Sequence, residues 1–311
     1  MGGELKTIAG TAAACVAQVL WVLLLAPLVE GLVRKLTARI QSRQGPPIWQ
    51  GWFDLLKLLG KEDLEAAEVP WLPRAAAFLS LGTLLFMACV LPLGAAPPLG
   101  EQTDAILLVH LVTLAGLGAL MAGFGAGGTY SLIGSSREVM VMVLLEPLLA
   151  VAVVAGAVHR NSLAVAEAAR GGVFAAEGFP WSGLVLLVVI LLAFPAFVQR
   201  VPFDVAEAET EIMEGWLMEC SGPTLALFKY TAMLKLVLYS ALFVNLFLPW
   251  GEGVGGVGAW LWFWVKTGAV IALVATVAAA HARYRTDQAV RWFGMMLAAA
   301  LGALWLAGLG Y

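Results

Sequence analysis

The chain has 311 residues, of which 61% are hydrophobic and only 13% are charged, with a formal net charge of −3. A soluble domain usually carries about 25% charged residues, so this composition excludes an ordinary soluble protein, and no nucleic-acid partner is expected. Apolar runs recur along the chain to its C-terminus, and a membrane-spanning helix needs about 20 mostly apolar residues. The sequence therefore predicts an all-α polytopic membrane protein.

Eight membrane-spanning helices are predicted in a single membrane domain that covers residues 1–311. Helices are favoured over a β-barrel because the runs are continuously apolar and do not alternate. The first run exceeds the roughly 7–15 apolar residues of a signal peptide, so we expect it to be retained. The fifth span is short and contains Pro195. The predicted spans cover residues 8–33, 74–92, 103–125, 137–158, 182–199, 224–248, 258–281 and 290–309.

Basic residues are distributed unevenly between the predicted loops. Twelve of the 18 Lys and Arg residues lie in loops on one side, three lie on the other and three lie within spans. The positive-inside rule places the richer side in the cytoplasm. Both termini are then expected outside.

The first cytoplasmic loop is predicted to contain a helix over residues 48–60, after the turn Gly45-Pro-Pro47. Gln50, Asp54 and Lys57 fall on a narrow polar stripe of this otherwise apolar helix. Such an amphipathic helix fits either the membrane interface or a groove covered by protein, and the sequence leaves both open.

The loop between the fifth and sixth spans, residues 200–222, is called the acidic loop. It holds six of the 21 acids of the chain. A helix is predicted from Pro202 to Glu214, because proline suits a first helical turn. Four of the acids would then share one face, at i, i+3, i+7 and i+10, with Glu209 pointing elsewhere. The six acids are Asp204, Glu207, Glu209, Glu211, Glu214 and Glu219.

Three interpretations of the acidic loop remain open. Neighbouring carboxylates near a medium of low dielectric constant repel one another, and repulsion and desolvation both raise their pKa values. The row would then suit a proton relay. It would equally suit docking of a basic partner, and a solvated loop without either role is the third interpretation.

Ionisable residues also lie within predicted spans, where a charge costs several kcal/mol and usually faces the protein interior or a water-filled cavity. Glu146 is in the middle of the fourth span, directly before Pro147, and we expect it to have a functional role. Lys229 and Lys235 lie in the sixth span, and Glu30 lies near the cytoplasmic end of the first. For Glu30 and Lys229 the alternative is that the side chain reaches the interface.

The three cysteines, Cys15, Cys89 and Cys220, are far apart and form no Cys-x-x-Cys pair. Because an iron–sulfur cluster is normally held by four thiolates, we expect this chain to hold no cluster of its own. No spacing of histidines indicates a metal site.

Several motifs resemble those of the family formed by the H, or ND1, subunit of respiratory complex I. The segment Arg200-Val-Pro-Phe-Asp-Val-Ala-Glu-Ala-Glu-Thr-Glu211, followed by Glu219-Cys-Ser-Gly222, is similar to the hallmark loop of that family. Further matches follow in order over residues 20–305. They are Arg43-Gln-Gly-Pro46, Asp54-Leu-Leu-Lys-Leu-Leu59, Tyr130-Ser-Leu-Ile-Gly-Ser-Ser-Arg-Glu138, Glu146 and Ala282-Arg-Tyr-Arg-Thr-Asp-Gln288.

Two departures from the complex I pattern favour another branch. Pro47 stands where complex I members usually have Asn, and Ala232 stands where they usually have Glu. In both features the chain resembles the membrane subunit of energy-converting group 4 [NiFe] hydrogenases. This branch includes the Ech-type subunit and the formate hydrogenlyase subunit 4 type. The missing Glu argues against a quinone site.

The resemblance implies a non-catalytic subunit that anchors a hydrogenase complex in the inner (cytoplasmic) membrane of a prokaryote. It would couple hydrogen chemistry, driven by ferredoxin, formate or carbon monoxide, to proton or sodium translocation. The implied partners are the hydrogenase large and small subunits, a ferredoxin-like iron–sulfur subunit and an antiporter-like membrane subunit. The [NiFe] centre and [4Fe-4S] clusters would belong to those partners. The alternatives are the quinone-site H subunit of an NADH:quinone oxidoreductase, a passive membrane anchor and a stand-alone transporter.

Two groups of residues are therefore predicted to be functional. The first group would carry or couple the ion movement, and the second would dock partner subunits. The coupling group is Glu30, Asp54, Glu146, Asp204, Glu207, Glu209, Glu211, Glu214, Glu219, Lys229 and Lys235. The docking group is Arg34, Arg39, Arg43, Arg137, Arg200, Arg283 and Arg285.

Overall fold

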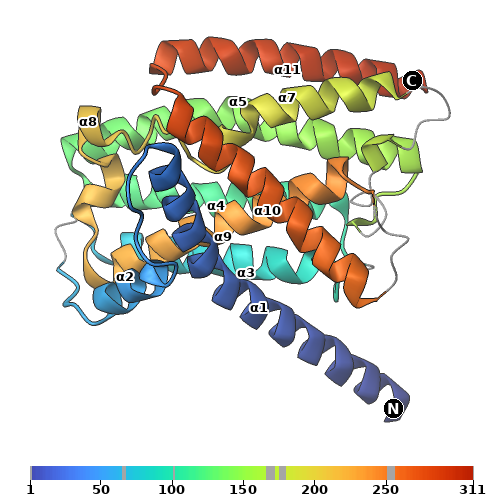
Figure 1. Cartoon of the computed structure of the whole chain (residues 1–311), viewed down its shortest axis with the longest axis horizontal. Coiled ribbons are helices and arrows are strands. Elements are labelled where there is room, and N and C mark those ends of the chain that lie inside the picture. The colour runs from blue at the N-terminus through green and yellow to red at the C-terminus, as the bar shows by residue number, and fades with distance from the viewer. Residues whose placement is uncertain are drawn as a thin grey trace.

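A computed structural model describes residues 2–64, 68–100, 102–165, 172–174, 180–250 and 256–310, without the side chains of residues 2–8, 209 and 210. Within these residues the chain is helical (Figure 1). The elements are α1 (Gly2–Ile40), α2 (Gln50–Leu59), α3 (Trp71–Val90), α4 (Ala105–Ala126), α5 (Thr129–Arg160), η1 (Gly172–Phe174), α7 (Trp181–Phe197), α8 (Glu209–Ile212), η2 (Gly215–Glu219), α9 (Gly222–Phe247), α10 (Val257–Ala280) and α11 (Thr286–Gly308).

The predicted class of polytopic helical membrane protein is confirmed. In the described part of the chain, seven helices are long and apolar enough to cross a membrane, namely α1, α3, α4, α5, α9, α10 and α11. The fifth predicted span corresponds to α7, which has 17 residues. At 1.5 Å per residue it is a little shorter than the roughly 30 Å core of a bilayer.

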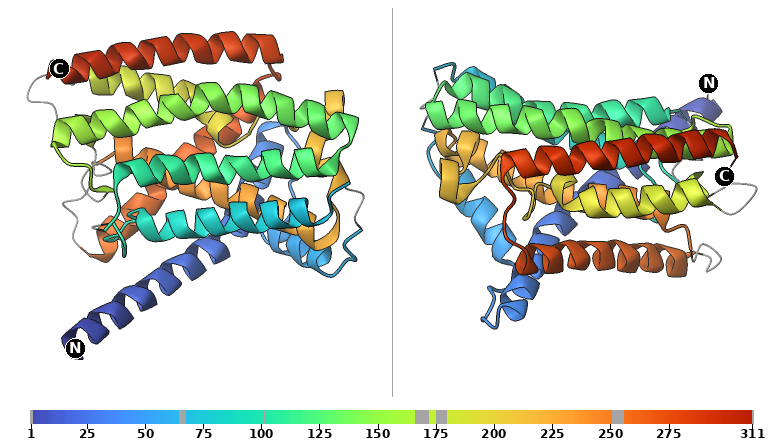
Figure 2. Two further views of the ribbon diagram at one scale, coloured as in Figure 1. Left: turned by 180° about the vertical axis from the view of Figure 1, so that it is seen from behind. Right: turned by 90° about the horizontal axis from the view of Figure 1, so that it is seen from above.

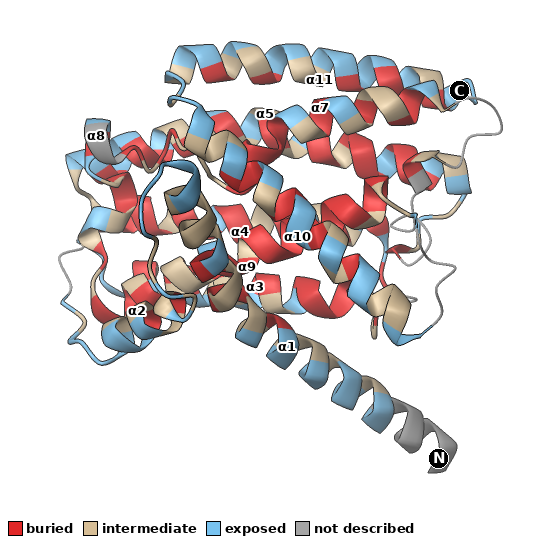
Figure 3. Ribbon diagram, viewed as in Figure 1, coloured by how far each residue is buried: buried red, intermediate tan, exposed pale blue. Residues whose placement is uncertain are grey.

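Helix α9 forms the centre of the bundle. It is the most deeply buried of the long helices, and it packs against α1, α3 and α10. Helices α3, α4 and α5 lie side by side, and α11 covers α5 and α7 (Figure 2). Burial is accordingly concentrated in the middle of the bundle (Figure 3). The ionisable residues of α9 are thereby held inside the protein.

Helix α1 is long and mostly exposed, and its N-terminal end projects from the bundle (Figure 1). Helix α2, which lies within the range predicted for the amphipathic helix, packs closely against it. A Cβ atom on Gly31 would lie 1.9 Å from the backbone oxygen of Ile48, and one on Gly51 would lie 2.4 Å from that of Pro27. Only glycine permits this contact. It fixes α2 against α1, and α2 also packs against α9.

Helix α5 begins at Thr129, eight residues before the predicted start of that span. The serines of this first part turn inward. Ser131 donates a hydrogen bond to the carbonyl of Gly123 at 3.1 Å, and Ser135 donates to that of Ser131 at 3.0 Å. Because their hydroxyl groups are satisfied in this way, polar residues extend the buried helix by two turns. Arg137 and Glu138, the first residues of the predicted span, therefore lie two turns inside the helix.

The predicted helix from Pro202 to Glu214 is wrong. Only residues 209–212 are helical, as α8, and Met213, Glu214 and Gly215 follow with φ angles of 52°, 67° and 59°. The reason is that apolar residues lie between the acids of this segment. A helix could not turn all of these apolar side chains toward the protein interior, whereas the irregular backbone buries each of them. The buried apolar residues are Phe203, Val205, Ala206 and Ala208.

Candidate functional site

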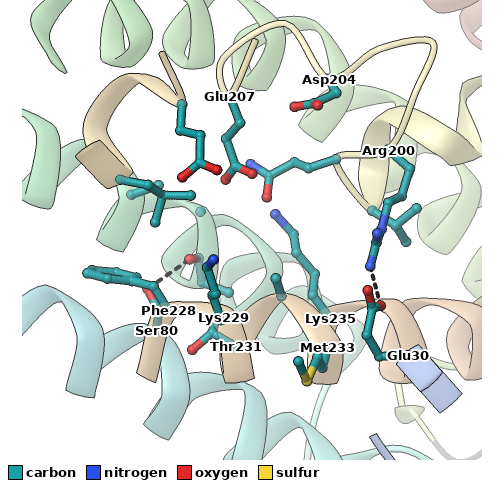
Figure 4. A pocket seen from close by; sticks show the side chains of 18 of the residues that line it. Glu30, Ser80, Arg200, Asp204, Glu207, Phe228, Lys229, Thr231, Met233 and Lys235 are labelled. Atoms are coloured by element: carbon teal, nitrogen blue, oxygen red, sulfur yellow. Dashed lines mark hydrogen bonds and ion pairs between the residues drawn. The ribbon is translucent and has the colours of Figure 1, made fainter. Parts of the chain in front are cut away.

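A cavity of about 300 Å³, called the central cavity, lies where the acidic loop meets α1 and α9. Among the described residues, four acids and four basic side chains line it. Figure 4 shows Glu207 of the loop facing Lys229 and Lys235 of α9 across this space. The charged lining residues are Glu30, Arg34, Arg200, Asp204, Glu207, Glu214, Lys229 and Lys235.

Helix α9 presents one face to the central cavity. Lys229, Ala232 and Lys235 are spaced three residues apart, which places them on one side of a helix, and all three line the cavity. Ala232 is the position at which complex I members were expected to carry a Glu. The small alanine leaves that part of the wall uncharged.

Glu30 joins α1 to the acidic loop at one wall of the cavity. Its carboxylate is buried, at 5% exposure, and it pairs with Arg200 of the acidic loop. It also accepts a hydrogen bond from Nε of Arg34 at 3.2 Å. Two guanidinium partners hold Glu30 as a fixed anion. This arrangement suits a structural junction better than repeated proton exchange.

The junction continues to α2 through Asp54. Arg34 Nη1 lies 2.6 Å from Asp54 Oδ2, and Gln50 donates a hydrogen bond to the other carboxylate oxygen at 2.8 Å. Partial burial disfavours the charged form of Asp54, but these bonds outweigh it and hold its pKa below its ordinary value. Asp54, like Glu30, therefore serves as a permanent negative charge.

Glu207 has the opposite character. Burial, together with the nearby carboxylates of Asp204 and Glu138, raises the pKa of its carboxyl group to about 8. A carboxyl group in this range exchanges protons readily near neutral pH. Of the predicted coupling residues in the acidic loop, Glu207 is thus the one best suited to a relay.

A second, smaller space, called the inner cavity, lies deeper in the bundle and has a volume of about 40 Å³. Glu138 and Glu146 of α5 line it, together with Tyr239 of α9. The Tyr239 hydroxyl is buried without a hydrogen-bond partner among the described residues. Buried polar groups of this kind are normally satisfied by water, and the inner cavity has room for one.

Two side chains, Gln199 and Lys235, line both cavities. The Gln199 amide donates a hydrogen bond to Glu138 at 2.6 Å. Lys235 is the ionisable residue shared by the two linings within the described chain, and it connects Glu207 on one side with Glu138 and Glu146 on the other. The structure thus brings Glu207, Lys235 and Glu146 into one series.

The sequence analysis did not select Glu138 or Gln199 as coupling residues. Glu138 is the second residue of the fourth predicted span, residues 137–158, so the sequence places it at the end of that span rather than inside the bundle. In α5, which begins at Thr129, Glu138 and Glu146 are eight residues apart and lie on neighbouring parts of one helix face. That spacing was the signal that could have identified Glu138.

The other predicted acids are spread over different surroundings. Asp204 pairs with Arg283 at 3.0 Å, and Glu211 pairs with Arg137 at 2.6 Å. Glu214 reaches the central cavity. Glu219 lies in a separate crevice with Asp63 and Arg74. The side chain of Glu209 lies outside the described residues.

The predicted docking arginines divide into two sets. The structure pairs the first set with acids of this same chain: Arg34, Arg137, Arg200 and Arg283. The second set is exposed to solvent: Arg39, Arg43 and Arg285. Only the second set is free of buried internal ion pairs, so it is better placed for contacts with other molecules.

Comparison with known proteins places this geometry in context. Residues 13–308 match the sequence profile of the family described as NADH dehydrogenase. The chain is 33% identical over 314 residues to hydrogenase-4 component C of Escherichia coli (strain K12), covering 94% of this chain and 95% of that protein. It is 32% identical over 240 residues to formate hydrogenlyase subunit 4 of the same organism, covering 76% and 77%.

More distant similarities extend to a quinone-linked enzyme and to a solved structure. The chain is 29% identical over 298 residues to the H subunit of NADH-quinone oxidoreductase from Acidovorax sp. (strain JS42), covering 89% of this chain and 83% of that protein. It superimposes with a TM-score of 0.83, at 24% identity, on a chain of the membrane-bound sulfane sulfur reductase, an archaeal respiratory membrane complex. The superposition covers 96% of this chain and 99% of the other, and it shows a shared fold.

Proposed function

The chain belongs to the NADH dehydrogenase family, and from this premise we propose that it is the membrane-anchoring, energy-coupling subunit of a multisubunit [NiFe] hydrogenase complex. The resemblance predicted from the acidic loop is confirmed by the family match and by the two hydrogenase-related proteins of Escherichia coli. Both of these relatives are matched over most of their length, which supports a similar place in a complex.

The observation that carries the proposal is the position of Lys235 between the two cavities. In the proposed relay, a redox event in a docked partner changes the electric field at Glu207, and its carboxyl group releases a proton. Lys235 accepts this proton as a neutral amine and passes it to the carboxylate of Glu138 or Glu146. Gln199 orients Glu138 through its hydrogen bond. The fixed charges of Glu30 and Asp54 hold α1, α2 and the acidic loop in place.

The proposed partners lie on the side of the acidic loop, which is the cytoplasmic side in this proposal. They are the hydrogenase large and small subunits and a ferredoxin-like iron–sulfur subunit, which would hold the [NiFe] centre and the [4Fe-4S] clusters. An antiporter-like subunit would contact the chain within the inner membrane of a prokaryote, with both termini of the chain outside. The exposed side chains of Arg39 and Arg285 suit docking.

A quinone-site subunit of an NADH:quinone oxidoreductase is the second candidate, supported by the similarity to the H subunit of NADH-quinone oxidoreductase. The central cavity argues against it. Sites for small apolar ligands are mostly lined by hydrophobic and aromatic side chains, whereas eight charged residues line this one. Ala232 also leaves out the carboxylate that the complex I pattern carries.

The decisive experiment combines purification with transport. A tagged chain, isolated from its own membrane, is expected to bring a nickel-containing subunit with it. In inverted vesicles, Glu146→Gln and Glu207→Gln should abolish proton or sodium uptake, measured with ion-sensitive dyes, while hydrogen production continues. The matched control Glu219→Gln removes a loop acid that lines neither cavity, and it should transport normally.

The alternatives predict different outcomes of the same experiment. Full transport by both Gln variants would reject the relay. If instead the Gln variants fail to assemble and never yield an intact but uncoupled complex, the chain is a passive anchor. Purification with a quinone-type large subunit that lacks nickel would favour the second candidate.

A further inference from the structure

A third cavity, called the lateral cavity, lies between the loop-side ends of α1 and α10 and has a volume of about 530 Å³. Figure 1 shows the end of α1, the turn that follows it and α10 close together on one face of the bundle. The walls of this cavity differ in chemistry. One is polar and basic: Arg34, Thr37, Gln41, Arg43, Gln44 and Arg200. The other is apolar: Leu236, Ile271, Val274, Ala275 and Ala278.

The basic wall has an excess of positive charge. Glu30 is the acid that lines the cavity within the described chain, and both Arg34 and Arg200 already pair with it. Arg43 is exposed, and its hydrogen bond goes to the neutral amide oxygen of Gln41 at 2.6 Å. Among the described residues this guanidinium group has only an uncharged partner, so it is available for an anion.

The side chains of the apolar wall are mostly buried in the protein, with Ile271, Val274 and Ala275 at most 6% exposed. The α10 residues of this wall lie in the last turns of a membrane-spanning helix that ends at Ala280. Toward the other end, Trp21 of α1 packs on Trp260 and Trp264 of α10, with ring centroids 5.1 and 6.0 Å apart. The two helices are thus joined at these rings, and the cavity lies between them toward the other end of α10.

We propose that the lateral cavity binds an anionic phospholipid of the leaflet on the acidic-loop side. Its phosphate group is held by Arg43 with the neighbouring Gln41 and Gln44, and one acyl chain lies along Ile271, Val274 and Ala278. Basic pockets between membrane helices on the cytoplasmic side suit anionic headgroups. A free phosphate ion would satisfy the arginine but leave the apolar wall uncovered, so the lipid is the ligand that fits both walls.

This site is separate from the proposed ion relay, because Glu207, Lys235 and Glu146 do not line it. It adjoins the central cavity through the shared residues Glu30, Arg34, Arg200 and Val201. A bound lipid would therefore cover the lateral side of the Glu30 junction. The proposal can hold or fail whatever the function of the complex.

Native mass spectrometry tests the proposal on the full chain purified with its accompanying subunits. The protein is delipidated and titrated with dioleoylphosphatidylglycerol or dioleoylphosphatidylcholine. We expect one phosphatidylglycerol to remain bound where phosphatidylcholine does not. Arg43→Gln should weaken its retention about tenfold, as expected for loss of one charge-assisted hydrogen bond. The control Arg285→Gln removes an exposed arginine outside the cavity and should retain the lipid.

A second variant tests the apolar wall without changing charge. Ala278→Phe places a large side chain in the path of the acyl chain and should also reduce retention, while the thermal unfolding midpoint shows whether the variant is folded. Equal retention of phosphatidylcholine would overturn the proposal. So would an equal loss in the Arg285 control, displacement of the lipid by inorganic phosphate, or a cavity that holds no lipid because a partner subunit fills it.

Discussion

The two halves of the acidic loop are both rich in carboxylates, but their surroundings differ. In the first half, residues 200–208, four apolar side chains are buried and Glu207 faces the central cavity. In the second half, residues 209–219, Ile212 and Trp216 are buried, but Met213 and Met218 are exposed and the side chain of Glu211 is 47% exposed. The same residue type is thus placed in a protein interior in one half and at a surface in the other.

Because of this difference, the two proposed roles of the acidic loop are compatible. The first half suits proton relay, and the second half suits docking of a partner. Carboxyl groups in low-dielectric surroundings acquire the raised pKa values that proton exchange requires, whereas exposed ones remain charged and attract basic partners. Glu214 is the exception within the second half. Its φ of 67° is unusual for a residue other than glycine, and its side chain lines the central cavity. Strained backbone of this kind tends to occur at functional sites.

The largest expected effect comes from removing the anion that holds the first half of the loop. Glu30→Gln removes the carboxylate that pairs with Arg200 and leaves Arg34 paired with Asp54 only. Loss of one member of a buried ion pair costs about 3–5 kcal/mol. Because the two arginine side chains remain 36% and 32% exposed, we expect a loss at the low end, about 3 kcal/mol. Chemical denaturation in detergent measures it.

The matched control for this prediction is Asp287→Asn. Asp287 lies 3.5 Å from Arg285, and both side chains are largely exposed. Exposed ion pairs contribute about 0–1 kcal/mol, so the control should remain close to the wild type. Equal effects of the two substitutions would show that Glu30 has no special structural role.

The second prediction concerns pH. The pKa of Glu207 is raised from its ordinary value of 4.5 to about 8, so the folded state binds this proton more tightly than the unfolded state. Its contribution to stability is complete below the unfolded pKa and is lost as the pH rises through the folded pKa. Since the side chain also lines a cavity with room for water, we expect a loss of about 2 kcal/mol between about pH 5 and about pH 8.

Unfolding measured across this pH range in wild type and in Glu207→Gln isolates the contribution. The variant should lack this part of the pH dependence, since glutamine does not titrate. Glu219→Gln, the same change outside both cavities, should keep the wild-type profile. Parallel profiles for wild type and Glu207→Gln would mean that Glu207 is ionised in the folded protein throughout, which removes the basis of the relay.

The third prediction concerns the ion pair of Asp204 with Arg283. Their side chains are 18% and 21% exposed, and the pair ties the first half of the loop to the segment after α10. Arg283→Gln should lower stability by about 1 kcal/mol, an intermediate value because the pair is partly buried. It should also increase hydrogen exchange at Phe203 and Val205, measured by mass spectrometry. An unchanged exchange rate there would show that the buried apolar residues alone hold the loop.

The helical framework followed from the sequence because apolar runs of membrane length have few alternative structures. The pair of Glu30 and Arg34 could also be predicted from the sequence, since residues four apart on a helix are neighbours. The backbone path of the acidic loop could not be predicted. Its backbone depends on where Phe203 and Val205 find apolar neighbours on other helices, and no local pattern specifies those contacts. A helical wheel aligned four acids, of which Asp204, Glu207 and Glu214 line the central cavity although they are not on one helix, whereas Glu211 pairs with Arg137 outside it.

For a related reason, only part of the candidate site could be predicted from the sequence. Glu146 and Lys235 were found because a charge in a membrane span is unusual by itself. Gln199 was missed because an uncharged side chain at the end of a span is unremarkable until Glu138 is known to lie opposite. The division of the arginines into internal and exposed sets likewise depends on tertiary contacts between segments that are far apart in the sequence.

The smallest expected effect is in the second half of the loop. Arg137 pairs with Glu211 at 2.6 Å, but the acid is largely exposed, so Glu211→Gln should change stability by about 0.5 kcal/mol or less. Binding is a better measure, because a charge at a rim mainly affects association with a partner. The variant should slow reassembly with the accompanying subunits at low salt, and added salt should reduce the difference from wild type. A loss of stability as large as that of Arg283→Gln would show that the two halves of the loop are equally buried, and the division between relay and docking would fail.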